Sequence, residues 1–194
     1  MGILLSFAPF VLYALMSRSA PLTVSLFSAA AVALVLLLRD HFIRHRAMKL
    51  LEIGTVLLFG GLGLYVWLTG GAWSIPEVRL AVDGGLLLIV LFTMLIRQPF
   101  TLQYAREQAP KEFHDSPKFL AVNQVLTAVW AMAFAVMTGA DLIMARLPQV
   151  PLAVGIAITV AALVGAAWFT GWYPSRLRRA AELSRAAPAQ TRAR

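Results

Sequence analysis

The pattern of hydrophobic and polar positions consists of long apolar runs separated by short polar stretches. A bilayer-spanning helix needs about 17–25 predominantly apolar residues. None of the runs alternates in polarity as a barrel strand does, and backbone groups in lipid must be bonded within their own segment, so helices are expected. Six spans are predicted, the first of them short: Ile3–Met16, Pro21–Leu38, Leu50–Leu68, Leu80–Ile96, Phe119–Met144 and Leu152–Trp172.

The composition supports a membrane protein. Of the 194 residues, 60% are hydrophobic and 13% charged, and the mean hydropathy is +0.76. A soluble domain carries about 25% charged residues. The chain contains no Cys, which excludes disulfides, thiolate metal sites and cysteine catalysis.

The basic residues predict the topology. Successive connecting segments and the C-terminal stretch carry 1, 4, 1, 4, 1 and 6 Lys or Arg residues. Under the positive-inside rule, the richer segments and both termini are cytoplasmic. The expected fold is therefore an all-α, polytopic membrane bundle of six transmembrane helices, arranged as three antiparallel hairpins.

This topology divides the chain into three parts. Residues 1–173 form the transmembrane domain, 97–118 are a cytoplasmic interfacial loop within it, and 174–194 form a basic cytoplasmic tail, partly disordered. Anionic lipid headgroups are the expected partner of the basic segments. Nucleic acid is not expected, because the tail lacks the interleaved aromatic residues that stack on bases.

The longest loop has a pattern of its own. Pro99 suits the start of a short interfacial helix over Phe100–Gln108, on which Phe100 and Tyr104 share a face. These three residues are candidates for docking a partner, although the segment also fits a simple connector. Ser116 followed by Pro117 predicts the cap and first residue of the fifth span.

Three carboxylates lie within or near the spans and are candidates for transport or for helix pairing: Glu52, Asp83 and Asp141. Arg79, four residues before Asp83, is expected to pair with it. No charge falls at the middle of a span, whereas proton and ion relays usually place groups there. The polar residues Asn123, Gln124 and Thr127 lie in the cytoplasmic third of the fifth span rather than at its middle.

Small and aromatic residues predict how the helices pack. Small residues let helix backbones approach closely, and Trp at span ends marks the membrane interface, as expected for Trp67, Trp73, Trp168 and Trp172. The mid-span indole N–H of Trp130 requires a partner, either Thr127 or a group on a neighbouring helix. The candidate packing residues are Phe59, Gly60, Gly61, Gly63, Gly84, Gly85 and Trp130.

The sequence contains no catalytic constellation that would indicate an enzyme. His41 and His45 are four residues apart, but a metal site needs a third ligand, so we interpret them as part of a basic collar at the headgroups. We therefore predict no catalytic residues, no cofactor and no metal site. A lipid-modifying membrane enzyme stays open as a third alternative.

The order of several features resembles the septation protein A family of bacterial inner-membrane proteins. These features are Phe7-Ala8-Pro9-Phe10, the basic loop, Phe59-Gly60-Gly61-Leu62, Arg97-Gln98-Pro99 and Trp130-Ala131-Met132-Ala133-Phe134. The resemblance implies a non-enzymatic role in maintenance of the cell envelope or in division, through contacts with other membrane proteins or self-association. The alternative is a small transporter or channel that uses the membrane carboxylates.

Overall fold

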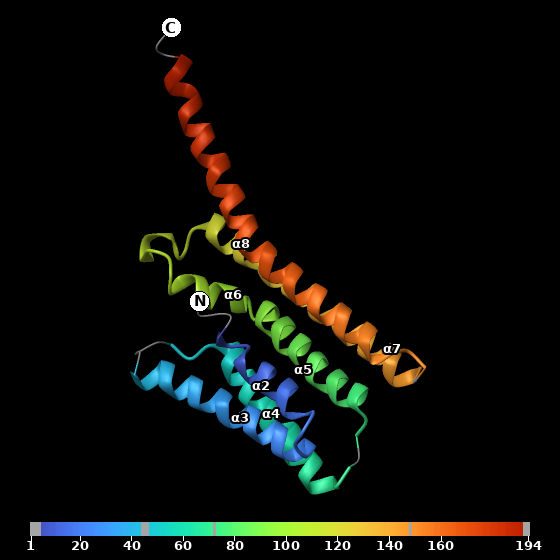
Figure 1. Cartoon of the computed structure of the whole chain (residues 1–194). Helices are drawn as coiled ribbons and strands as arrows, with labels where there is room; N and C mark the ends of the chain where they lie inside the picture. Colours follow the sequence, from blue (N-terminus) through green and yellow to red (C-terminus); the bar gives the residue numbers. More distant parts are fainter. Residues whose placement is uncertain (1–4, 44–46, 72, 148, 192–194) are drawn as a thin grey trace.

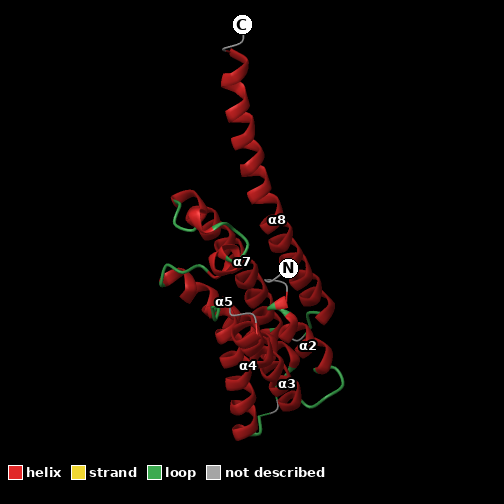
Figure 2. Ribbon diagram, turned by 90° about the vertical axis from the view of Figure 1, so that its left-hand side faces the viewer, coloured by secondary structure: helices red, strands yellow, loops and turns green. Residues whose placement is uncertain are grey.

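The computed structural model describes residues 5–43, 47–71, 73–147 and 149–191, and this part of the chain consists of helices joined by loops, with no strand (Figures 1 and 2). Within these described ranges, five helices are long and apolar enough to cross a membrane. The elements in chain order are α2 (Ala8–Met16), α3 (Leu22–Leu38), the π-helical turn η1 (Arg39–Ile43), α4 (Leu50–Thr69), α5 (Ile75–Leu95), α6 (Phe100–Arg106), the 3₁₀ turn η2 (Lys111–Phe113), α7 (Pro117–Arg146) and α8 (Leu152–Thr191).

The helix ends have local causes that the sequence contains. Ser74 and Glu77 form a capping box at the start of α5, with the Ser74 N–H 2.7 Å from Glu77 Oε2. Gly70 ends α4 with a φ of 62°, a conformation that glycine adopts without strain. The Ser116 hydroxyl accepts from the Phe119 N–H at 3.2 Å, which confirms the predicted cap of α7.

Two predicted spans differ in length from the helices observed. The described part of the first run contains α2, which is nine residues long and therefore rises only about 14 Å. The last helix does not end near Trp172 but continues to Thr191. The Ala- and Arg-rich composition of this extension explains its helicity, because both residues are strong helix formers.

The helices pack mainly with their neighbours in sequence, with one exception. α2 packs on α3, α3 on α4, and α7 on α8. The exception is α5, which packs most extensively on α7, although the short α6 and its loop separate the two helices in sequence. In Figure 1, α2, α3 and α4 form one side of the molecule, whereas α5, α7 and α8 form the other. Apart from its contact with α7, α8 is largely uncovered.

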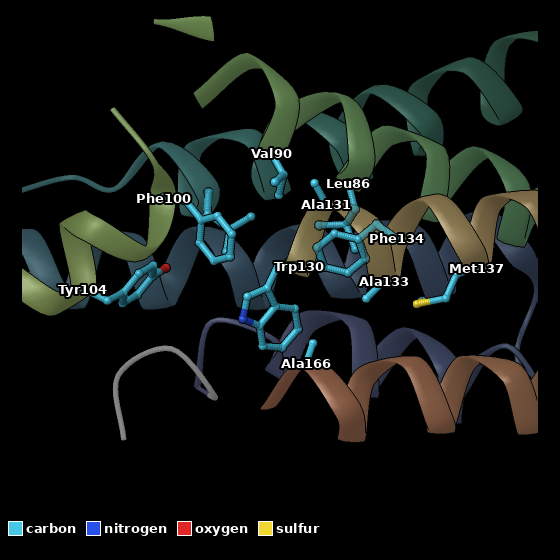
Figure 3. Close-up of a cluster of buried hydrophobic side chains, with 11 residues drawn as sticks. Leu86, Val90, Phe100, Tyr104, Trp130, Ala131, Ala133, Phe134, Met137 and Ala166 are labelled. Atoms are coloured by element: carbon cyan, nitrogen blue, oxygen red, sulfur yellow. The ribbon is translucent and has the colours of Figure 1, made fainter. Parts of the chain in front are cut away.

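The core is aromatic and continuous across these two sides. One cluster surrounds Trp130 and Phe134 on α7 and includes Phe100 and Ala166 (Figure 3). The other surrounds Phe59 on α4. Phe7 stacks on Trp130 with ring centroids 5.1 Å apart, and Phe10 contacts Phe59 at 4.9 Å. The N-terminal segment therefore joins both clusters.

The predicted packing residues are not equivalent in the structure. A methyl group at Gly85 would collide with Leu58 on α4, and one at Gly63 would lie 3.2 Å from the ring of Phe27 on α3. At Gly84 it would make ordinary contact with Thr138 at 3.7 Å. At Gly60 and Gly61 it would meet nothing within 4 Å, so no neighbouring helix explains glycine there. Phe59 and Trp130 are buried.

Candidate functional site

Two clusters of buried charged residues lie at opposite ends of the bundle. The Lys49 cluster consists of Ser6, Asp40, Lys49, Glu52, Tyr104 and Glu107. The Arg79 cluster consists of Arg79, Asp83, Asp141 and Thr159. The first gathers around the start of α4 and around α6, whereas the second gathers near the start of α5, the end of α7 and the start of α8.

Lys49 is the centre of the first cluster. Its side chain is only 3% exposed, and its ammonium lies 2.9 Å from Glu107 Oε1, 3.3 Å from Glu52 Oε1 and 3.9 Å from Asp40 Oδ2. It also lies 5.0 Å from the centre of the Tyr104 ring. A buried ammonium requires such compensation, because losing its hydration costs several kcal/mol.

A chain of hydroxyl groups completes this cluster. The Tyr104 hydroxyl donates to Ser6 Oγ at 2.8 Å, and Ser6 Oγ donates to Glu52 Oε1 at 3.1 Å. Burial raises the pKa of the Tyr104 hydroxyl, and the negative charge of Glu52 raises it further, so Tyr104 remains a donor. These bonds connect the N-terminal segment and α4 to α6, which places Ser6 at the same end as the two basic loops.

A small cavity lies beside the Lys49 cluster. It offers about 10 Å³ and is lined in part by Ser6, Asp40 and Glu52. A single buried water needs about 10–15 Å³. Glu52 Oε2 is buried and has no hydrogen-bond partner among the described residues, so a water here would have an acceptor to bind. The space is too small for a larger substrate.

The Arg79 cluster connects three long helices. Arg79 on α5 donates from Nε to Asp141 Oδ1 on α7 at 2.9 Å, and from Nη2 to Thr159 Oγ1 on α8 at 2.7 Å. The expected pair with Asp83 is replaced by this contact, because the fully buried Asp141 lies across from Arg79. Asp83 lies close beside both groups and is 9% exposed.

The carboxyl groups of the Arg79 cluster are not fully neutralised or hydrogen-bonded. One guanidinium faces two carboxyl groups, and Asp141 Oδ2 is buried without a hydrogen-bond partner in the described part of the chain. Two neighbouring carboxyl groups beside one guanidinium favour the binding of one further proton. Asp83 and Asp141 are thus brought together, whereas Glu52 belongs to the other cluster.

The residues expected to dock a partner lie inside the bundle instead. Phe100 and Tyr104 are 0% and 3% exposed, and Pro99 is buried as well. The reason is that α6 folds back against α7, where the Thr101 hydroxyl donates to the Asn123 carbonyl oxygen at 2.8 Å. The Trp130 N–H finds its partner on α8, donating to Thr170 Oγ1 at 3.0 Å.

Several residues of these clusters gave little signal in the sequence. Lys49 and Glu107 resemble ordinary loop charges, and Ser6 is a single hydroxyl in an apolar run. Lys49 and Glu52 are three residues apart, but Glu107 lies 58 residues beyond Lys49, and Ser6 reaches Glu52 and Tyr104 over 46 and 98 residues, so spacing along one helix does not indicate these contacts. His45 lies outside the described residues.

The chain matches no family model, no curated protein and no solved structure at a significant level.

Proposed function

We propose that the protein is a bacterial inner-membrane protein whose chain crosses the membrane six times, with both termini in the cytoplasm. The crossings are three antiparallel hairpins: α2 with α3, α4 with α5, and α7 with α8. Two observations support this topology. Fourteen of the 17 basic residues fall on one side, and Ser6 bonds to α4 and α6 at that same end. The first crossing then includes residues on both sides of α2.

Within this membrane, the protein acts in envelope maintenance or division by holding other membrane proteins, without enzymatic chemistry. The observation that carries this proposal is that the buried cations are neutralised within the bundle itself. Lys49 and Arg79 bond to carboxylates of their own bundle, and a packed aromatic core lies between the two clusters. Large apolar side chains instead lie on the outer surface, including Val160 and Val164, which are 54% and 61% exposed on α8.

A deletion strain tests this role. We expect it to show abnormal shape, division or envelope leakage under osmotic stress, which the wild-type gene restores. The α8 face is tested by complementation with Val160→Trp/Val164→Trp, which adds bulk outside the core. The matched control is Val11→Trp/Leu15→Trp on α2, where both side chains are also exposed.

We expect the α8 variant to fail and the α2 variant to complement, with equal amounts of both in the membrane. A deletion strain with normal shape, division and envelope under osmotic stress would contradict the proposed role. Equal complementation by the two variants would remove α8 as the contact surface.

A small transporter or channel that uses Glu52, Asp83 and Asp141 is the second candidate. The close approach of the Asp83 and Asp141 carboxyl groups beside the Arg79 guanidinium favours it. In proteoliposomes containing a pH-sensitive dye, this function predicts proton flux that Asp83→Asn and Asp141→Asn abolish. Asp115→Asn is the control, because the Asp115 side chain is 96% exposed. Absence of flux in the wild-type protein would end this candidate.

A further inference from the structure

A groove of about 870 Å³ lies between α6, the η2 turn, the first turns of α7 and the stretch of α8 around Thr170–Arg178. This volume is within the range of small-molecule sites in proteins, about 300–1,000 Å³. Its walls are predominantly apolar and include Phe113, Phe119, Leu126 and Leu177. Tyr104 of the Lys49 cluster contributes to its wall, but no charged residue of either cluster lines it, and the proposed role in the envelope does not use it.

Asn123 supplies an unused hydrogen-bond acceptor on the groove wall. Its side chain is 2% exposed, and Oδ1 has no hydrogen-bond partner in the part of the chain that the structure describes. The amide orientation is fixed, because Nδ2 donates to the Phe119 carbonyl oxygen at 2.9 Å and exchanging the two atoms would oppose two acceptors. A buried polar atom without a bond costs about 1–3 kcal/mol, so a ligand donor fits here.

The rim of the groove is basic. Lys118 and Arg178 line it and are exposed, and the described lining residues include no Asp or Glu. The groove also lies at the N-terminus of α7, a 30-residue helix whose dipole places partial positive charge there. The two basic side chains, the lack of acidic residues in the described lining and the α7 N-terminus all favour binding of a phosphate group at the rim.

The basic rim at Lys118 and the amide of Asn123 lie at different depths in the groove, and this difference restricts the class of ligand further. Asn123 lies five residues along α7 from Lys118, which corresponds to about 7.5 Å of helix rise. The ligand therefore carries an anionic phosphate, then a hydroxyl donor a few ångströms deeper, then an apolar chain. A diacyl phospholipid has only ester acceptors below its phosphate. A lysophospholipid has a free glycerol hydroxyl at that position and a single acyl chain.

We propose that this groove binds a lysophospholipid with an anionic phosphate. The phosphate lies against Lys118, Arg178 and the α7 N-terminus, while the glycerol hydroxyl donates to Asn123 Oδ1. The acyl chain lies along Phe119 and Leu126.

The test is equilibrium binding to the full-length protein in nanodiscs, with radiolabelled oleoyl lysophosphatidate as probe. Its 2-deoxy analogue, which lacks only the hydroxyl, is the matched ligand. We expect the wild-type protein to bind the probe about tenfold more tightly than the analogue, the ratio for one hydrogen bond of ordinary strength. Asn123→Leu should bind both ligands equally and as weakly as the wild-type protein binds the analogue.

Surface variants test the phosphate contact without disturbing the core. We expect Lys118→Gln/Arg178→Gln to weaken both ligands by at least tenfold and to leave their ratio unchanged. Gln124→Leu, at an exposed neighbour of Asn123, and Arg146→Gln, at the other end of α7, are controls that should bind as wild type. Equal binding of probe and analogue by the wild-type protein, or no binding of either, would overturn the proposal.

Discussion

The guanidinium of Arg79 on α5 bonds the carboxylate of Asp141 on α7, 62 residues further along the chain, and this carboxylate is 0% exposed. The same guanidinium reaches Thr159 on α8. One side chain therefore fixes the relative positions of three long helices at one end of the bundle.

Removing the Arg79 guanidinium alone should lower the free energy of unfolding more than removing both Arg79 and Asp141. We expect Arg79→Met to lower the free energy of unfolding by about 3–5 kcal/mol, because Asp141 is then buried without its cation. The double variant Arg79→Met/Asp141→Leu should recover part of this loss. Denaturant unfolding in detergent measures both. If the double variant is as unstable as Arg79→Met, the buried carboxylate is not the source of the cost.

Two glycines that look alike in sequence should respond differently to alanine. Gly85→Ala forces Leu58 out of its position and should lower the free energy of unfolding by about 1–2 kcal/mol. Gly60→Ala adds its methyl group to open space and should stabilise the helix by up to about 1 kcal/mol. Thermal unfolding of the two variants in the same detergent compares them directly, and equal shifts would contradict the packing described for α4 and α5.

Arg97 holds an unfavourable backbone conformation at the end of α5. Its φ is 58°, and the turn is closed by a bond from the Gln98 N–H to the Thr93 carbonyl oxygen at 2.9 Å. We expect Arg97→Gly to raise the free energy of unfolding by about 1 kcal/mol, because glycine adopts this conformation freely. Ala105→Gly, inside α6, should lower it by a similar amount. A loss of stability in both variants would show that the Arg97 side chain matters more than its backbone.

Tyr104 should make the protein sensitive to alkaline pH. Its pKa in the folded state is raised by burial and by Glu52, so above about pH 10 the unfolded chain loses a proton that the folded protein keeps. Stability then falls as pH rises, by up to about 1.4 kcal/mol per pH unit from this group. Tyr104→Phe should show a shallower decline between pH 9 and pH 11 in thermal unfolding. Identical pH profiles would exclude this contribution.

The helical membrane architecture follows from the sequence because it depends on local properties. Apolar run length, the Ser74 and Ser116 caps and the glycine at position 70 are each determined by a few neighbouring residues. The five long helices therefore fall close to five of the predicted runs. The tail composition predicts that the sixth helix extends into the first part of the tail, and the structure continues α8 to Thr191.

The site was harder to predict because its geometry depends on contacts between distant helices. The sequence marks Asp83 and Asp141 as unusual, but the i, i+4 spacing alone pairs Arg79 with Asp83, whereas the structure bonds Arg79 to Asp141. Phe100 and Tyr104 share a face as expected, yet whether that face points outward or inward depends on how α6 packs. Only the fold places Tyr104 against Ser6 and Glu52.

The length of α8 has a mechanical consequence. Its 40 residues correspond to a rod of about 60 Å, whereas the hydrocarbon layer is about 30 Å thick. A helix of this length that crosses the layer extends about 30 Å beyond it, and α7 is its principal support among the described helices. A change of about 10° in its inclination displaces the far end by about 5 Å for a 30 Å arm.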